Sequence, residues 1–332
     1  MEDTVVPVVL ADVAEGMDQH FYVGPVSEPS KVAEFGWDGS LIRLIGHRGK
    51  GPGELTGIGH VVATSDSLIG AFSINRIVWF PLSGQPPITE TVAQPLDDAR
   101  LVGLAGRRVV GSNRSSNLRT FVAYGPDGRG RTFGDTNGFD PAGPRTFRSG
   151  MGSRWLADAG SGIWTVSEYF APIFEQWSFD GHRTRRLRLP ASWFTPYGPD
   201  QLNKLAQFGI RSVPIATTKS AWRSRDGYLW TITQVPDRKW RFSLDSATTP
   251  PGLTRTGRPI RSFYGFDRDL VLDAVLAVYS VTDSTATLIA SQQVDQALTQ
   301  FLSDSVIAQE TYPDGLSSTI RLFRFRLIHP PH

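Results

Sequence analysis

The segment Gly46–Leu55 is the first place where residue types and spacing suggest chemistry, because glycines cluster around a lysine. Glycine-rich loops of this kind can bind phosphate through backbone N–H groups and a lysine side chain. Here, however, Lys50 precedes Gly51, no Ser or Thr directly follows the lysine, and Pro52 has no N–H to donate. We therefore predict a sharp connection between structural repeats, in which Glu54 accepts backbone hydrogen bonds.

Metal chemistry has one weak candidate. Oxygen-bearing side chains alternate along Asp135–Asp140, as they do in calcium loops, but glycine takes the fourth position and Thr146 stands where such loops end in glutamate. Whether calcium binds there stays open. Cysteine is absent, and the histidines show neither H-x-H nor i, i+4 spacing. The histidines are His20, His47, His60, His182, His329 and His332. We expect no metal centre and no cofactor.

Composition indicates which elements must position these residues. The 332 residues include 33 Gly and 23 Pro, too many punctuating residues for long helices. Nine Trp and 19 Phe supply the bulky side chains that pleated, half-buried surfaces favour. The composition therefore predicts an all-β fold.

Charge argues against nucleic acid as a partner. The formal net charge is +2, and no basic tract is present. The densest cationic stretch, 183–188, alternates with Leu187 and Leu189, which predicts a strand with one solvated face. A docking site for an acidic partner is the alternative for this stretch.

An internal repeat predicts the architecture. Five segments share the order apolar strand, polar loop, second apolar strand and tight turn, and the clearest runs from Gly162 through Trp177 to Asp180-Gly181. The other four segments begin near Phe21, Ser67, Arg108 and Gly227. A period of about 40–50 residues with roughly four strands is typical of β-propellers. A single four-stranded sheet cannot bury both faces, whereas neighbours on either side cover them.

We accordingly predict one domain, residues 1–332, folded as a six-bladed β-propeller of four-stranded antiparallel blades. The early strand Val5–Leu10 is expected to close the ring by pairing with the C-terminal strands, which avoids long unpaired edges. Two stretches depart from the β pattern: 200–208 predicts a short inserted helix, and Val294–Leu302 a second helical turn.

Two stretches carry a resemblance to a known family. Leu68-Ile69-Gly70 followed by Asn75–Phe80 resembles the NHL repeat, and Gly46–Leu55 resembles the G-x-x-G-x-G-P-G-E-[FL] segment between blades of that group. Over roughly residues 18–327 the chain is similar to six-bladed propellers common in Gemmatimonadota and related bacteria. The resemblance implies a six-bladed fold, a periplasmic or extracytoplasmic location and no established catalytic activity. The N-terminal residues lack the pattern of a signal peptide.

Candidate binding residues lie in loops that we expect between the first and second strands of each repeat, where they would share one face of the ring. They are Asn75, Arg76, Arg114, Asn117, Glu168, Tyr169, Phe170, Asp237 and Arg238.

The sequence thus predicts a non-catalytic protein-binding or scaffolding propeller, an accessory subunit of a larger membrane-associated complex. It has no stretch of about 18 apolar residues, so we expect no transmembrane segment of its own. The alternative is a small-molecule or carbohydrate binder, or a hydrolase, that uses the central funnel. No G-x-S-x-G motif supports a hydrolase, so the enzyme alternative rests on analogy between folds.

Overall fold

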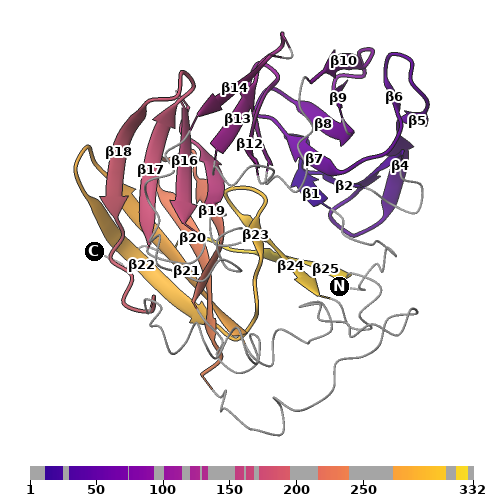
Figure 1. Cartoon of the computed structure of the whole chain (residues 1–332). Helices are drawn as coiled ribbons and strands as arrows, with labels where there is room; N and C mark the ends of the chain where they lie inside the picture. Colours follow the sequence, from indigo (N-terminus) through magenta and orange to yellow (C-terminus); the bar gives the residue numbers. More distant parts are fainter. Residues whose placement is uncertain are drawn as a thin grey trace, which may run out of the picture.

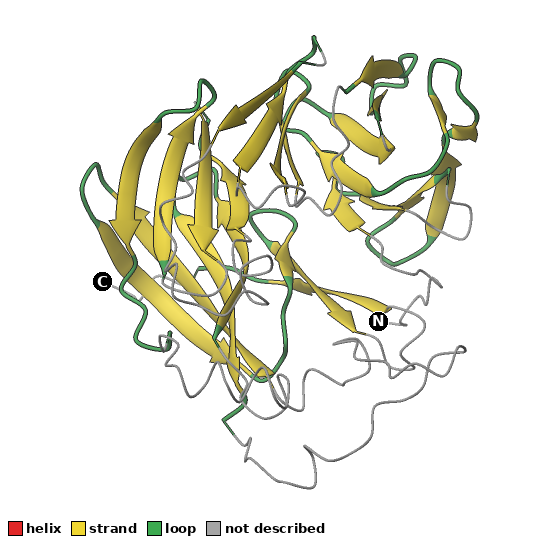
Figure 2. Cartoon of the chain, viewed as in Figure 1, coloured by secondary structure: helices red, strands yellow, loops and turns green. Residues whose placement is uncertain are grey.

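In the computed structural model the described residues form strands joined by turns and loops (Figure 1). The described residues are 12–24, 30–73, 75–92, 101–113, 120–127, 129–133, 154–160, 162–167, 172–194, 216–238, 272–311 and 319–327. Within these ranges every regular element is a strand and no helix occurs (Figure 2). The all-β prediction is confirmed.

Six antiparallel sheets make up the described part, and we number them in chain order. Sheet 1 contains β1 (Asp12–Glu15), β2 (Phe21–Gly24), β3 (Val32–Phe35) and β4 (Leu41–Ile45). Sheet 2 contains β7 (His60–Ala63), β8 (Leu68–Ser73), β9 (Arg76–Pro81) and β10 (Ile88–Thr91). Sheet 3 contains β11 (Leu101–Leu104), β12 (Arg108–Asn113), β13 (Thr120–Tyr124) and β14 (Gly130–Phe133).

The later sheets follow the same order. Sheet 4 contains β15 (Arg154–Asp158), β16 (Gly162–Ser167), β17 (Ile173–Ser178) and β18 (Arg183–Arg188). Sheet 5 contains β19 (Thr217–Arg223), β20 (Leu229–Pro236), β21 (Leu272–Val281) and β22 (Ala286–Val294). Sheet 6 contains β23 (Gln300–Phe301), β24 (Val306–Thr311) and β25 (Thr319–Arg324). A small parallel pair, β5 (His47–Arg48) and β6 (Glu54–Leu55), lies between sheets 1 and 2 in the sequence.

The sheets stand side by side in a ring. The first strand of each sheet contacts the first strand of the next, from β1 through β7, β11, β15 and β19 to β23. In Figure 1 the yellow strands of sheet 6 lie between sheet 5 and the indigo sheet 1. This arrangement is that of a β-propeller, so the fold class is confirmed. Six blades for the whole chain stays a prediction.

Apolar clusters fill every junction between neighbouring sheets. Alternating residues of one strand serve two junctions: Ile163 of β16 packs with sheet 3, whereas Trp164 packs with sheet 5. At the junction of sheet 6 with sheet 1, Val13 and Phe21 meet Val306. Each sheet is thus covered on both faces by its neighbours, because a period of two sends successive side chains to opposite sides.

A five-residue turn recurs between strands and explains the Asp-Gly signals in the sequence. In the turn from Gly36 to Ser40, the N–H of Gly36 donates to the oxygen of Ser40 at 2.9 Å, and Gly39 N donates to Gly36 O at 3.0 Å. Asp38 accepts from the N–H and hydroxyl of Ser40 at 3.0 and 2.6 Å. Gly39 has φ of 80°, which glycine adopts without a steric penalty. The tight turns predicted from Asp-Gly pairs are confirmed here and at Asp180-Gly181.

One predicted helical turn is wrong. β22 continues to Val294, and β23 begins at Gln300, so the stretch Val294–Leu302 contains no helix. The buried amide of Gln234 donates to the backbone oxygens of Ala297 and Leu298 at 3.2 and 3.0 Å, so these carbonyls are bound from outside the segment. The predicted helix at 200–208 and the closing strand Val5–Leu10 lie outside the described residues, so the single-domain interpretation with its strand closure stays a prediction.

Candidate functional site

The described loop residues share one end of the ring. Asn75 lies between β8 and β9, Arg76 is the first residue of β9, and Asp237 and Arg238 follow β20, so these loops join the second and third strands of a sheet. The sequence repeat starts at the second strand of each sheet, so its first and second strands are the second and third strands of the sheet. Because the strands follow one another in the same antiparallel order in every sheet, the loops between second and third strands all lie at the same end of the ring. Arg114, Asn117, Glu168, Tyr169 and Phe170 lie outside the residues whose side chains the structure describes.

Arg76 binds the backbone of the segment that connects sheets 1 and 2. Its two terminal nitrogens donate to the backbone oxygens of Lys50 and Gly51 at 3.0 and 2.9 Å. Glu54 accepts a 2.6 Å hydrogen bond from the N–H of Gly51, as the sequence predicted. A Cβ at Gly49 would lie 2.0 Å from Glu54 Oε2, so any other residue there would have to displace the Glu54 carboxylate. These contacts give Arg76 a structural role in holding the loop.

Arg238 lies against a buried carboxylate. Its Nε donates to Asp273 Oδ2 at 2.9 Å, and Asp273 is fully buried although Arg238 remains 56% exposed. Gln293 Nε2 donates to the same oxygen at 2.6 Å. The side chain of Asp273 therefore joins Arg238, after β20, to Gln293, near the end of β22.

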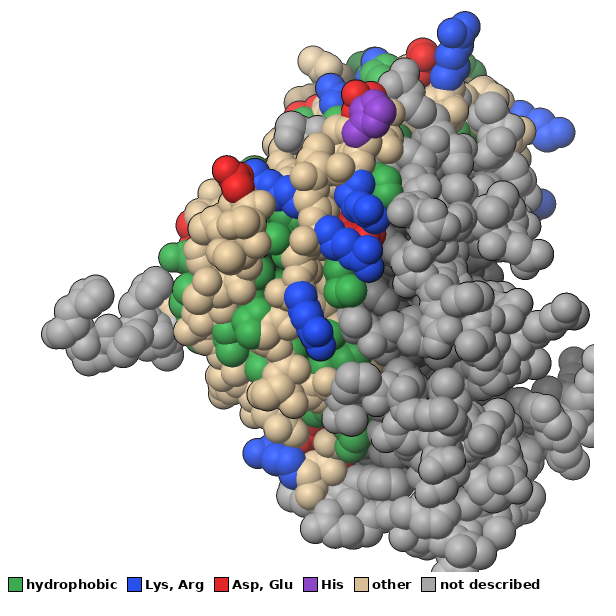
Figure 3. Space-filling view, turned by 60° about the vertical axis from the view of Figure 1, so that its left-hand side comes forward, with side chains coloured by type: hydrophobic (Ala, Val, Ile, Leu, Met, Phe, Trp, Pro, Cys, Tyr) green, Lys and Arg blue, Asp and Glu red, His purple; other side chains and the backbone are tan. Residues whose placement is uncertain are grey.

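The arginines of β18 form a row on the outside of sheet 4. Figure 3 shows Lys and Arg side chains gathered on the face that lies at the left in Figure 1, where β18 and β22 are. Arg183 and Arg186 approach the buried Glu175 at 3.1 and 3.6 Å, and Arg185 donates to Asp283 at 2.6 Å. Leu187 is buried beneath them. The predicted strand with one solvated face is confirmed, and acidic side chains of this protein neutralise part of the row.

An apolar surface lies on the outermost strand of sheet 1. In β4, Leu41, Ile42 and Leu44 are 55%, 46% and 45% exposed. β4 pairs with β3 on one side only, and no described strand pairs with its other edge. The backbone N–H and C=O groups on that edge thus pair with no strand of the described residues, as in an edge strand. Exposed aliphatic side chains on an edge strand are unusual, because proteins normally place charges there.

The ionic contacts of Arg43 hold this strand in place. Arg43 Nε donates to Glu34 Oε2 at 2.5 Å, and Glu34 on β3 is almost fully buried. The hydrogen bond to Glu34 raises the pKa of Arg43, so the guanidinium stays charged. His20 Nδ1 contacts the other oxygen of Glu34 at 2.7 Å. Beyond β4, His47, Arg48 and Lys50 are exposed. We call Leu41, Ile42, Leu44, His47, Arg48 and Lys50 the outer-strand surface.

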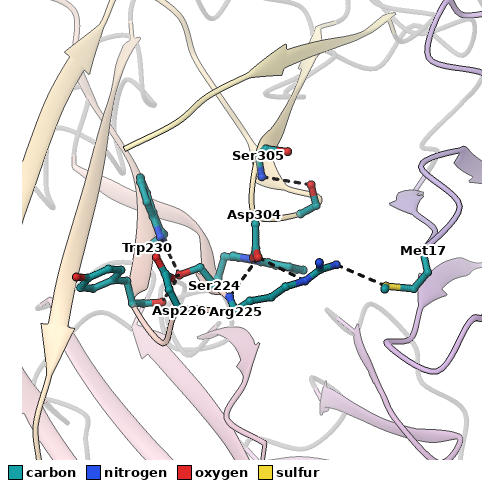
Figure 4. A network of polar contacts seen from close by, with 10 residues as sticks. Met17, Ser224, Arg225, Asp226, Trp230, Asp304 and Ser305 are labelled. Carbon is teal, nitrogen blue, oxygen red and sulfur yellow. Dashed lines mark hydrogen bonds and ion pairs between the residues drawn. The ribbon is translucent and has the colours of Figure 1, made fainter. Parts of the chain in front are cut away.

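At the end of the ring opposite Asn75 and Asp237, turns of three sheets meet in a polar network (Figure 4). The Arg225 backbone N–H donates to Asp304 Oδ2 at 3.2 Å, and Trp222 Nε1 donates to Asp304 Oδ1 at 2.8 Å. The guanidinium of Arg225 lies 3.7 Å from Asp304 and 3.9 Å from the sulfur of Met17. The network joins the β19–β20 turn to the turns of sheets 6 and 1.

Glu15, the last residue of β1, lies beside this network. Burial raises the pKa of its carboxyl, and a hydrogen bond with Ser303 and the charges of Arg324 and Arg225 oppose the rise. One oxygen of Glu15 is buried without a hydrogen-bond partner. Glu15 and Asp304 are therefore two carboxyls in unlike surroundings near the ring centre, which is an arrangement that can bind a polar ligand or exchange a proton.

The sequence did not reveal either the outer-strand surface or the polar network around Glu15 and Asp304. The signal for β4 was present, since Leu41-Ile42-Arg43-Leu44-Ile45 has four aliphatic residues in five and does not alternate. Nothing in the sequence links Glu15 with Asp304, which come together through closure of the ring.

Comparisons with known proteins agree with the fold. No family model matches the chain, and no curated protein matches it in sequence. Among solved structures, the chain is similar to a Bacteroides fragilis protein whose name proposes export, at 10% identity and TM-score 0.52, covering 97% of this chain and 92% of that one. It is also similar to virginiamycin B lyase from Staphylococcus aureus, at 9% identity and TM-score 0.47, covering 97% and 96%. A gluconolactonase from Xanthomonas campestris matches at 8% identity and TM-score 0.49, covering 97% and 88%.

At such identities the likeness concerns the fold and says nothing of ligand or activity. Independently, the described part of the chain has no helix with the length and hydropathy of a membrane span.

Proposed function

We propose that this propeller is a non-catalytic binding module that takes a protein partner at the outer-strand surface. The observation that carries the proposal is the exposure of Leu41, Ile42 and Leu44 on an edge strand. An extended segment of a partner can add to such an edge, because main-chain hydrogen bonds then form on the open side of β4. The aliphatic side chains would be buried against the partner.

The charges beside the strand indicate the chemistry of the partner. His47, Arg48 and Lys50 follow β4 directly and are exposed, while Arg43 is already neutralised by Glu34. A partner segment that combines apolar residues with acidic ones fits this surface best. We place the protein in a periplasmic or extracytoplasmic setting, as an accessory or scaffolding subunit of a membrane-associated complex, in line with its resemblance to NHL-like propellers. The near-neutral net charge of +2 supports a protein partner over nucleic acid.

A comparison of variants tests the proposal. The double substitution Leu41→Lys with Leu44→Lys should abolish recovery of partner proteins from native extract, because charges in place of these two leucines oppose burial. Ile289→Lys is the matched control, since Ile289 is also aliphatic, 44% exposed and on the outer strand of a sheet. We expect the same proteins with the wild type and the Ile289 variant and their loss from the double variant. Equal recovery with all three would refute the outer-strand surface as the docking site.

A second candidate function is supported by the turn network. Arg225 is 80% exposed, and the raised pKa of Glu15 places a protonatable carboxyl nearby. We infer that a small polar ligand, such as a carbohydrate, is the alternative occupant, bound at the ring centre. A thermal-shift screen of sugars and small acids would show stabilisation that Arg225→Ala removes and Arg129→Ala retains, because Arg129 is exposed on another turn. Shifts that persist in the Arg225 variant would exclude this network as the binding site.

A further inference from the structure

Three aspartates from separate parts of the chain gather at one end of sheet 5. Asp237 directly follows β20, Asp273 is the second residue of β21, and Asp295 directly follows β22. Each offers a carboxylate oxygen, and these three oxygens lie within 4.8 Å of one another. Antiparallel order brings them together, because the end of β20, the start of β21 and the end of β22 lie at the same end of the sheet.

The buried carboxylate of Asp273 is a second indication of a bound cation. Its side chain is fully buried, and Oδ2 accepts hydrogen bonds from Arg238 Nε and Gln293 Nε2 at 2.9 and 2.6 Å. The other oxygen, Oδ1, is buried and has no hydrogen-bond partner. The three-oxygen cluster includes this carboxyl group. A buried carboxylate oxygen without a partner costs free energy, and a bound cation would remove that cost.

The donor set selects the class of cation. All three side chains offer carboxylate oxygens, which are the ligands of hard divalent cations rather than of zinc or copper. Ca²⁺ bonds oxygen at about 2.3–2.6 Å and tolerates irregular geometry, so ligand oxygens on its shell can lie as far apart as these do. Mg²⁺ demands a smaller, near-octahedral shell.

We propose that Asp237, Asp273 and Asp295 form a calcium site, with Arg238 and Gln293 orienting Asp273 through Oδ2 and leaving Oδ1 for the ion. The bound ion would tie together the ends of β20, β21 and β22. This site is separate from the outer-strand surface and does not depend on the proposed function. It replaces the sequence-based expectation that the chain has no metal centre.

Titration of the full chain tests the site. After treatment with a chelator, calorimetric titration with Ca²⁺ should show one site per chain with a Kd of about 10⁻⁴–10⁻³ M, the range of calcium sites with few charged ligands. Asp295→Asn should weaken binding tenfold or more, and because Asp295 is exposed this variant should fold. Asp237→Asn should weaken binding to a similar degree. Asp283→Asn is the matched control, since Asp283 lies in the β21–β22 turn at the other end of the same sheet and is 94% exposed.

The thermal midpoint gives a second readout that does not depend on heats of binding. Saturating Ca²⁺ should raise the midpoint of the wild type and of Asp283→Asn and leave that of Asp295→Asn unchanged. Absence of any binding and of any shift would overturn the proposal. Equal binding by the wild type and an Asp237→Asn, Asp295→Asn double variant would do the same. Binding of Mg²⁺ in preference to Ca²⁺ would overturn the assignment of calcium.

Discussion

The side-chain amide of Gln300, in β23, donates a 3.0 Å hydrogen bond to the backbone oxygen of Val13, in β1. The two residues are 287 positions apart, and the bond joins the last described sheet to the first. Beside it, Phe21 of sheet 1 and Val306 of sheet 6 belong to one apolar cluster. The ring is thus closed between sheets 6 and 1 by packing and by this contact.

Replacement of Gln300 should weaken closure. We expect Gln300→Ala to lower the free energy of unfolding by about 1 kcal/mol, because it removes one hydrogen bond and leaves the Val13 carbonyl without it. Gln292→Ala, at an exposed position of β22, should change stability little. Urea denaturation of both variants measures the difference, and equal midpoints would show that the contact contributes nothing.

Two glycines with similar backbones should respond differently to alanine. Gly84 has φ of 78°, and no atom lies within 4 Å of the position that a Cβ would take. Gly84→Ala should therefore lower the free energy of unfolding by roughly 1–2 kcal/mol through the backbone conformation alone. Gly53 has φ of 76°, and its Cβ would also meet Pro87 Cγ at 2.5 Å. Gly53→Ala should therefore cost about 1–3 kcal/mol more, through overpacking. Equal losses in denaturant titration would mean that the ring of Pro87 moves aside freely.

The pH dependence of stability should report on Glu15. Burial raises its folded-state pKa above 4.5, so the folded protein binds a proton more tightly than the unfolded chain does. Stability should fall as pH rises through the interval from 4.5 to the folded pKa, and Glu15→Gln should reduce that fall. Above this interval the variant should be more stable by less than about 1 kcal/mol, because solvent screens a partly exposed carboxyl.

The Glu15→Gln variant should keep part of the pH dependence of stability, because burial also raises the pKa of Glu90. Urea unfolding at a series of pH values from 4 to 8 gives the measurement. A variant whose stability follows the same pH curve as the wild type would contradict the role of Glu15.

Removal of residues 1–11 tests the predicted closing strand. β25 is the outermost described strand of sheet 6, and we propose that Val5–Leu10 pairs with its open edge. Truncation should then lower the unfolding midpoint and promote self-association through the uncovered strand. Removal of residues 328–332 provides the control. Size-exclusion chromatography and thermal unfolding report both effects, and an unaffected truncated protein would refute the pairing.

The sequence was sufficient for the part of the fold that local signals encode. Asp38-Gly39 and Asp180-Gly181 marked hairpins because glycine at positive φ is a local requirement. The innermost strands were missed, since β1 (Asp12-Val13-Ala14-Glu15) is short, lacks aromatic residues and has charged ends. Its burial comes from neighbouring sheets, which no local pattern reveals.

The candidate sites depend on distant parts of the chain and could be predicted only in part. Asp237 and Arg238 were singled out from the sequence, but Asp273 and Asp295 join them only through strand pairing in sheet 5. Likewise, Arg76 looked like a surface binding residue until the loop that it holds was located. The exposure of Leu41 depends on which strand ends a sheet, and this follows from topology rather than from hydropathy.

A photo-crosslinking amino acid at position 42, introduced in the native host, tests the docking surface most directly. Ile42 projects from the outer strand of sheet 1, and Ile289 on the outer strand of sheet 5 is the matched control position. We predict a discrete crosslinked protein with the probe at 42 and none with the probe at 289. No adduct at 42, or the same adduct at both positions, would contradict partner binding at β4.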